Sequence, residues 1–370
     1  MTEKELLYYV ALQKAKGIGA VLAKRLIKTA GSAEAVFKTP ENRLGKTFGI
    51  SSKILSALHD KTLLEKAEKE VEYILYHRIR FTGFTDEAYP KRLLETHDAP
   101  ILLFSKGNIV WDDRPAIGIV GTRKMTAYGK RFIERFIKDI SPYNPVIISG
   151  FAYGVDITAH LEAMHHGLQT IAVMAHGIDQ TYPHPHRTYV ERVLENGGFY
   201  TEFHHDELPL RENFISRNRI VAGMSDAVIV VESAKKGGAL ITADMAFSYG
   251  REVFAVPGRF DDIWSEGCNM LIRNNKAAIL NNANDLVYYL NWSNRTGSKK
   301  PKAVQTRMSF DLEGEEKTVY DYLKEKGKSL LDTISVETGI PVYKLSGILL
   351  NMELQGVVNP LPGKFFEVNG

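Results

Sequence analysis

Residues 116–123 have the sequence AIGIVGTR, in which a short apolar run ends directly in Gly-Thr-Arg. Further apolar runs rich in β-branched residues or alanine lie at 146–150, 170–175, 198–202, 227–232 and 252–256. Because these runs are nearly continuous rather than alternating with polar residues, they predict strands that are buried on both faces of a sheet.

Helical patterns separate the predicted strands. They lie at 128–140, 157–166, 187–196, 214–222 and 240–249. A regular alternation of buried strands and helices along the chain is typical of a parallel sheet with helices on both faces. The sequence therefore predicts an α/β fold, a doubly wound Rossmann-like sheet, over residues 79–290.

The segment before the sheet, residues 1–78, has the pattern of a small helical domain. Helices are expected at 5–16, 20–30, 32–37, 51–59 and 63–78. The joint Gly17-Ile18-Gly19 resembles a helix-hairpin-helix element, in which backbone N–H groups at a helix N-terminus can hold a phosphate. We therefore predict a SAM/helix-hairpin-helix-like domain, and the alternative is a small helical domain in which the glycines serve the turns alone.

The segment after the sheet divides into a linker and a second small domain. Residues 291–312 are polar and basic and predict a linker. Three helical patterns follow at 315–326, 331–338 and 342–355, and a strand hairpin is expected at 357–368. Three helices and a hairpin predict a winged-helix domain over residues 313–370. Because the expected recognition helix holds one lysine and one glutamate, we predict that this domain works mainly in protein contacts.

The composition is that of a chain able to bury a core, since 44% of its 370 residues are hydrophobic and 25% are charged. No apolar stretch approaches the length of a bilayer and the N-terminus lacks a secretion signal, so we expect a cytoplasmic protein without a membrane partner. The single cysteine, Cys268, fits a reducing compartment and is expected to be buried.

The formal net charge of +3 is unevenly distributed along the chain. Residues 1–78 hold 14 Lys and Arg against 9 Asp and Glu, whereas residues 313–370 hold 6 against 9. Any anion-binding surface is therefore expected to be local.

Glycines and basic residues gather where the predicted strands end. The candidates are Gly121, Thr122 and Arg123 after the first strand, Gly150 and Tyr153 after the second, and Lys235, Lys236 and Gly238 after the strand at 227–232. Ligands of parallel sheets bind beyond the carboxyl ends of the strands, and glycine turns before helices suit phosphates. No G-x-G-x-x-G follows the first strand, so a dinucleotide fits poorly and no cofactor is expected.

A second basic group lies within one helical turn and comprises Phe214, Arg217, Asn218 and Arg219. Guanidinium groups suit phosphates, and an aromatic ring offers a stacking face to a base. One of the two arginines is expected instead to pair with Glu202 or Asp226 and hold the sheet.

Two groups of residues suggest a catalytic or a metal site, but their sequence context argues against both. Ser149, Asp156 and His160 suggest a triad, but Ser149 lies outside a G-x-S-x-G turn, and the other two are spaced to bond each other. The histidine pairs 165–166, 184 with 186, and 204–205 have no carboxylate or cysteine at matching spacing. We expect them to be surface or loop residues.

Seven motifs occur in a fixed order along the central segment. They are Gly-Thr-Arg at 121–123, Ser-Gly-x-Ala-x-Gly-Val-Asp at 149–156, Tyr-Pro at 182–183, Phe-x-x-Arg-Asn-Arg-Ile at 214–220, Gly-Ala-Leu-Ile-Thr-Ala at 238–243, Gly-Arg-Glu-Val-Phe-Ala-Val-Pro-Gly at 250–258 and Gly-x-Asn-x-Leu-Ile at 267–272. This series resembles the DprA/Smf family, the DNA-processing protein A proteins. Thr122 replaces a frequent serine of the family, and Tyr153 replaces a frequent arginine.

The resemblance implies a cytosolic protein, not an enzyme, that binds single-stranded DNA during natural transformation. It implies that the protein protects the incoming strand, forms a homodimer through the Rossmann-like domain and helps to load the RecA recombinase. The family's DNA pocket maps onto Gly121, Thr122, Arg123, Gly150, Phe214, Arg217 and Asn218.

Two alternatives remain open at this stage. One is a nucleotide-processing enzyme of the phosphoribohydrolase kind on a related sheet, although its Pro-Gly-Gly-x-Gly-Thr-x-x-Glu loop is absent from the sequence. The other is a scaffold that binds no polymer. Substituting Arg123 and Arg217 together is expected to weaken DNA binding without unfolding the chain.

Overall fold

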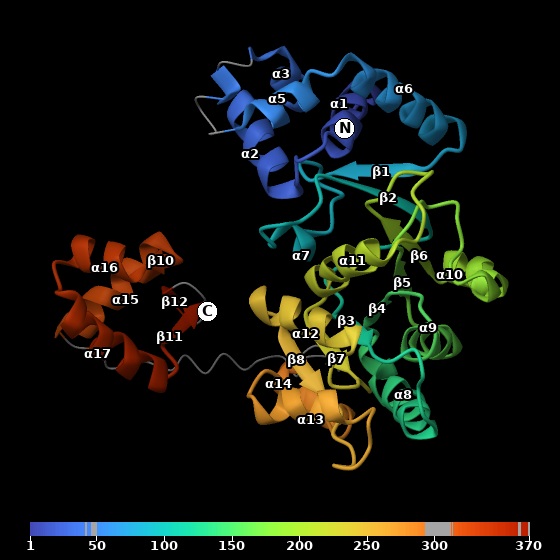
Figure 1. Cartoon of the computed structure of the whole chain (residues 1–370). Coiled ribbons are helices and arrows are strands. Elements are labelled where there is room, and N and C mark those ends of the chain that lie inside the picture. Colours follow the sequence, from blue (N-terminus) through green and yellow to red (C-terminus); the bar gives the residue numbers. More distant parts are fainter. Residues whose placement is uncertain (41–42, 46–49, 293–311, 313, 362–363, 369–370) are drawn as a thin grey trace. The chain divides into compact units, whose positions relative to one another are not determined.

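The computed structural model describes residues 1–40, 43–45, 50–292, 312, 314–361 and 364–368. The chain forms two compact units, Met1–Thr296 and Gly297–Gly370 (Figure 1). The linker predicted at 291–312 lies outside the described residues except for positions 291, 292 and 312.

The first unit begins with a helical part, in which the five predicted helices lie within two residues of their predicted bounds. These helices are α1 (Glu3–Lys14), α2 (Ala20–Ala30), α3 (Ala33–Lys38), α5 (Ser52–Leu58) and α6 (Lys61–Tyr76). A capping box starts α1: Thr2 Oγ1 accepts from the Glu5 N–H at 3.2 Å, and the Glu5 carboxylate accepts from the Thr2 N–H at 2.8 Å. In the folded unit α1 packs along α6.

Among the described residues, nine strands form one sheet in the order β1-β2-β6-β5-β4-β3-β7-β8-β9. Their bounds are β1 (Arg80–Gly83), β2 (Leu102–Gly107), β3 (Ala116–Val120), β4 (Val146–Ser149), β5 (Thr170–Val173), β6 (Gly197–Thr201), β7 (Ala227–Val230), β8 (Glu252–Ala255) and β9 (Ala278–Ile279). The part from β6 to β9 is parallel, while β2 pairs antiparallel with β6 and β1 antiparallel with β2. The six predicted strands are confirmed.

Three strands of the sheet were not predicted. β1 and β2 form an antiparallel edge, and β9 is two residues long. β1 and β9 are short edge strands that lack a continuous apolar run. β2 has six residues and a buried apolar start, Leu102–Phe104, and this signal was missed.

Both faces of the sheet are buried, and the residues of β3 show why. Ile117 and Ile119 belong to one hydrophobic cluster with α8 (Ala127–Ile140) and α9 (Val155–His165). Ala116 and Val120, which point to the opposite face, belong to a second cluster with α11 (Arg211–Met224) and α12 (Gly238–Ser248). The remaining helices of this part are α7 (Lys91–Leu94), α10 (Val190–Glu195), α13 (Glu266–Arg273) and α14 (Ala283–Tyr289).

The helical part shares its core with the sheet. Leu6, Val10 and Leu26 belong to the same hydrophobic cluster as Val228 of β7 and Ile220 of α11. The described residues of segment 1–78 therefore fold against the sheet as part of one compact unit.

The second unit contains α15 (Gly314–Lys326), α16 (Leu331–Thr338) and α17 (Val342–Leu354), with β10 (Ser329–Leu330), β11 (Val358–Leu361) and β12 (Phe365–Val368). The three strands pair antiparallel in the order β10-β12-β11. The three helices and the hairpin share a single hydrophobic core. Each contributes buried side chains to it, for example Leu323, Ile334, Leu349 and Val358. This is the winged-helix arrangement predicted from the sequence. In the described parts of both units, no helix combines the length and the apolarity needed to cross a bilayer.

Candidate nucleic-acid interface

The sheet has a topological switch point between β3 and β7. From β3 the chain builds β4, β5 and β6 on one side, and from β7 it builds β8 and β9 on the other. Crevices for ligands form beyond the carboxyl ends of strands at such a point. A cavity of about 610 Å³ lies there, lined by the turns after β3 and β7 and by the first half of α11. We call it the switch-point pocket.

The turn after β3 is fixed by its own backbone. The Thr122 N–H donates to the Glu232 carbonyl at 2.7 Å, and the Thr122 carbonyl accepts from the Val155 N–H at 3.2 Å. A Cβ at Gly121 would lie 2.5 Å from Val155 Cγ2, so only glycine lets the turn pass this close to α9. Arg123, which is exposed, follows directly after this hydrogen-bonded turn.

An aromatic ring lies beside this arginine. The Arg123 guanidinium carbon is 5.1 Å from the centre of the Phe214 ring, which is a cation–π distance. Tyr182 packs its ring edge against Phe214 at 5.6 Å between centres, and both aromatic residues line the pocket. The pocket therefore holds a positive charge over an aromatic ring.

Arg217 forms part of the pocket floor and is only 3% exposed. Its Nη1 donates to the Gly150 carbonyl at 2.6 Å and also to the Val173 carbonyl, tying the ends of β4 and β5 together. A Cβ at Gly150 would lie 2.4 Å from this nitrogen, so Gly150 makes room for the guanidinium. Burial lowers the pKa of Arg217 to about 10, which still leaves it charged at neutral pH.

Asp156 lies on the same floor and has structural partners. Its Oδ2 accepts from the Gly150 N–H at 3.2 Å and from the Ala152 N–H at 3.4 Å. Burial raises the pKa of this carboxyl group, and the charge of Arg217 opposes that rise. The acid thus orders the turn after β4.

The structure brings most of the predicted site residues together. Those lining the switch-point pocket are Gly121, Thr122, Arg123, Phe214, Arg217, Asn218 and Gly238, with Gly150 directly beneath Arg217. Three others do not line it. Tyr153 is 43% exposed and packs edge-on against His186, and Lys235 lines a neighbouring cavity.

Arg219 is the third of these. Its Nη2 pairs with Glu202, and its Nη1 donates to the Asp98 carbonyl at 2.6 Å. This is the sheet-holding pair that the sequence assigned to one of the two arginines. The helix turns Arg219 away from the pocket while Arg217 and Asn218 line it.

Several pocket residues had not been predicted as part of the site, among them Arg211 and Trp264. Arg211 lines the pocket because α11 begins at Arg211, three residues before the predicted helix. Trp264 comes from the loop after β8. The proline and glycine at 257–258 were the sequence signal that a loop of the site begins there. Lys236, one of the cations predicted for the site, also lines the pocket.

The suggested triad is not assembled as one. Ser149 Oγ donates to the Ile119 carbonyl at 2.6 Å, and His160 Nδ1 lies 2.7 Å from Thr170 Oγ1. Because Thr170 Oγ1 itself donates to the Ile147 carbonyl, it accepts from the His160 ring. His160 Nε2 is buried without a hydrogen-bond partner among the described residues.

His160 gives a testable dependence of stability on pH. Burial lowers its pKa to about 3, whereas an unfolded histidine takes up a proton near pH 6.5. Below about pH 6.5 the unfolded chain therefore binds one more proton, and stability falls by about 1.4 kcal/mol per pH unit from this residue. Urea unfolding of the protein and of His160→Gln between about pH 7 and pH 5 measures the difference in slope. Parallel slopes would contradict a buried neutral imidazole.

One group of described residues has the donors of a metal site: Glu70, His205 and Asp206 have ligand atoms within 4.8 Å of one another. The ammonium group of Lys14 already lies 3.3 Å from Glu70 Oε2 and supplies a positive charge there. A metal ion would have to displace it. The sequence missed this carboxylate because Glu70 lies far from the histidines along the chain.

The joint predicted to hold a phosphate faces a different cavity, of about 270 Å³. Ile18, Gly19 and Ala20 line it together with the carboxylates of Glu202 and Glu207. Glu202 is paired there with Arg219, which lines the same cavity, so the phosphate-binding role of this turn stays a prediction.

The family model of DNA recombination-mediator protein A matches residues 80–291, and that of the DprA winged helix domain matches residues 304–364. The chain is 30% identical to Protein Smf of Synechocystis over 99% of its own length and 100% of the relative's length.

Two solved structures are similar to this one. The X-ray structure of DNA processing protein A from Streptococcus pneumoniae has a TM-score of 0.61 and 26% identity, over 78% of this chain and 98% of that chain. The second, from Helicobacter pylori, is described as showing the single-stranded DNA binding mode of DNA processing protein A; its TM-score is 0.51 with 27% identity, over 58% of this chain and 97% of that chain. A family model that covers the whole sheet, together with a full-length relative, shows that this chain belongs to the DNA recombination-mediator protein A family, DprA/Smf.

Proposed function

We propose that this protein binds single-stranded DNA in the switch-point pocket and acts as a recombination mediator in natural transformation. In this role it protects the incoming strand and passes it to a RecA-type recombinase, working as a homodimer through the sheet part. Family membership and the related structure from Helicobacter pylori support the proposal.

The observation that carries the proposal is the pair formed by Arg123 and Phe214, 5.1 Å apart at the mouth of a glycine-lined crevice. A guanidinium group binds a phosphate, and a ring binds the face of any base, so the pair suits a strand of any sequence. A base is available for such stacking only when it is unpaired. Lys236 and Arg211 add positive charge to the same cavity.

A catalytic role has weaker support from the pocket. Asp156, the acid on its floor, is buried and engaged by two backbone amides. Release of a free base from a nucleoside monophosphate would support the nucleotide-processing alternative in place of the mediator role.

The first test compares single-stranded and double-stranded oligonucleotides of about 20 nucleotides by fluorescence anisotropy. We expect clearly tighter binding of the single strand. Because about three phosphates would be neutralised, affinity should fall roughly 20-fold between about 50 and 200 mM salt. Equal affinity for both forms, or binding that salt leaves unchanged, would contradict the proposal.

A further inference from the structure

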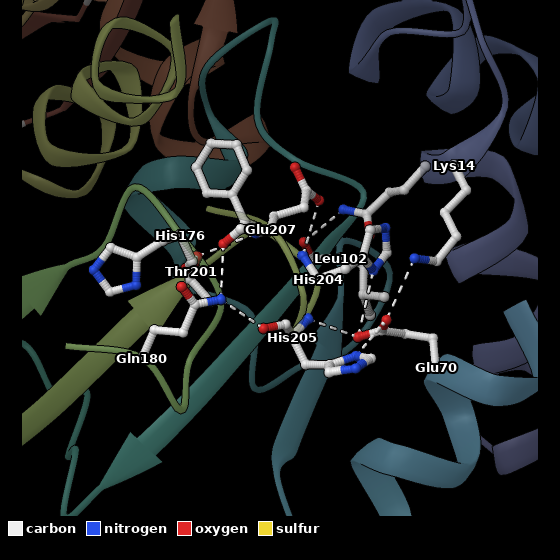
Figure 2. A network of polar contacts seen from close by, with 11 residues as sticks. Lys14, Glu70, Leu102, His176, Gln180, Thr201, His204, His205 and Glu207 are labelled. Carbon is white, nitrogen blue, oxygen red and sulfur yellow. Dashed lines mark hydrogen bonds and ion pairs between the residues drawn. The ribbon is translucent and has the colours of Figure 1, made fainter. Parts of the chain in front are cut away.

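The helical part contacts the sheet part through a buried carboxylate on α6. Glu70 is 2% exposed, and its Oε1 accepts from the backbone N–H of His205 at 2.9 Å (Figure 2). Its Oε2 lies 2.8 Å from His205 Nδ1 and 3.3 Å from the Lys14 ammonium. Burial alone would raise the pKa of Glu70, but His204, the His205 amide and Lys14 lower it well below its usual range, so the carboxylate is charged.

A second residue of α6 reaches the same region. The ring of Tyr73 stacks on the His205 ring with 3.8 Å between centres and 16° between planes. Tyr73 Oη donates to Asp179 Oδ2 at 3.2 Å. Asp179 belongs to the loop after β5, residues 174–183, and His205 to the loop after β6, residues 202–210; we call these the β5 loop and the β6 loop.

The two loops are also bonded to each other. The Gly177 N–H donates to the Glu207 carbonyl at 3.0 Å. Gln180 Nε2 donates to the His205 carbonyl at 2.8 Å and to the Glu207 carbonyl at 3.0 Å, as Figure 2 shows. The two loops therefore form one hydrogen-bonded layer, which α6 contacts through Glu70 and Tyr73.

This layer ends at the rim of the switch-point pocket. Tyr182 of the β5 loop and Pro209 of the β6 loop both line the pocket. Tyr182 packs its edge on Phe214, and α11, which carries Phe214, begins immediately after the β6 loop. A continuous path of contacts thus joins α6 to the proposed stacking ring.

We propose that the N-terminal helical part is a structural element of the DNA site, in which Glu70 and Tyr73 are positioning residues that hold the two loops and, through them, the Tyr182–Phe214 rim. This inference rests on the proposed function. Neither residue lines the switch-point pocket, so both act through the loops.

Glu70→Gln tests this inference in the full-length protein, with Glu72→Gln as the matched control. Both changes remove one negative charge from α6, but Glu72 is exposed. Electrostatics alone would leave DNA affinity unchanged or slightly increased in both variants. We expect Glu70→Gln to weaken binding of a single-stranded oligonucleotide about fivefold and Glu72→Gln to leave it unchanged. The same effect in both variants would overturn the inference.

Hydrogen exchange provides a readout that does not depend on DNA. Glu70→Gln should speed exchange at 174–183 and 202–210, while β3 and β4 keep their protection. Tyr73→Ala, at a half-buried position, should do the same if Glu70→Gln folds poorly. Unchanged exchange in both loops would overturn the positioning role. If the unmodified protein failed to bind single strands, only the proposed function would fall.

A double-mutant cycle then distinguishes positioning from a general loss of stability. If Glu70 acts on DNA binding through the position of the Phe214 ring, Glu70→Gln should have little further effect on DNA affinity in a Phe214→Ala background. An undiminished fivefold loss in that background would contradict the path through the rim.

Discussion

Replacing Arg217 by alanine is expected to lower the free energy of unfolding by about 3 kcal/mol. The guanidinium group donates to the Gly150 and Val173 carbonyls, which follow or end two adjacent strands, and it is almost fully buried. Alanine would leave both carbonyls without this charged donor and would leave Asp156 without the opposing charge beside it. Hydrogen bonds to charged groups contribute more than neutral ones, and their unpaired partners are costly to bury.

Urea unfolding at neutral pH measures this loss, with Arg211→Ala as the control. Arg211 lies on the same helix and also lines the pocket, but it is exposed, so its removal should change stability by about 0.5 kcal/mol or less. If Arg217→Ala were as stable as the control, the buried role of Arg217 would be refuted.

This structural role alters an expectation from the sequence. The residue type and its place in Phe-x-x-Arg-Asn-Arg suggested that Arg217 could be exchanged together with Arg123 without unfolding the chain. The motif identified the pocket, but it could not show that the carbonyls after β4 and β5 lie within reach of the guanidinium. Those groups are 67 and 44 residues away along the chain.

Contacts distant in sequence also decide which of Arg217 and Arg219 lines the pocket and which one pairs with an acid. Helical spacing predicts that residues 217 and 219 lie about 200° apart around α11, so the sequence could foresee that only one faces a ligand. Which of them faces the ligand depends on Glu202, which follows β6 and pairs with Arg219. The order of the strands in the sheet places Glu202 beside α11, and the hydrophobic periodicity of a sequence does not reveal strand order.

The central fold could be predicted because buried parallel strands carry their own signal. Ile117 and Ile119 on one face and Ala116 and Val120 on the other leave no polar side in β3. β1 lacked such a run, and the cluster around Glu70 depends on packing between α6 and a distant loop. Contacts of that kind follow from tertiary structure alone.

The largest expected loss of DNA binding comes from Arg123→Ala, about 20-fold at low salt. Arg123 is exposed on a turn whose backbone bonds do not involve its side chain, so the change should lower stability by no more than the roughly 0.5–1 kcal/mol of its exposed contact with the Phe214 ring. Loss of one phosphate contact should also make the salt dependence shallower by about 0.7 in log–log slope. Lys138→Ala, which removes an equal charge from the far end of α8, should leave affinity within about twofold.

Phe214→Ala separates the two halves of the Arg123–Phe214 pair. The ring contributes stacking rather than charge, so its removal should weaken binding about tenfold while the salt slope stays as in the unmodified protein. The double variant should lose less than the product of the two single losses, because each side chain positions the other at 5.1 Å. Equal salt slopes for Arg123→Ala and Phe214→Ala would contradict this division, since the phosphate would then be held by other cations of the pocket. In that case Lys236 and Arg211, which line the same cavity, would carry the electrostatic part of binding.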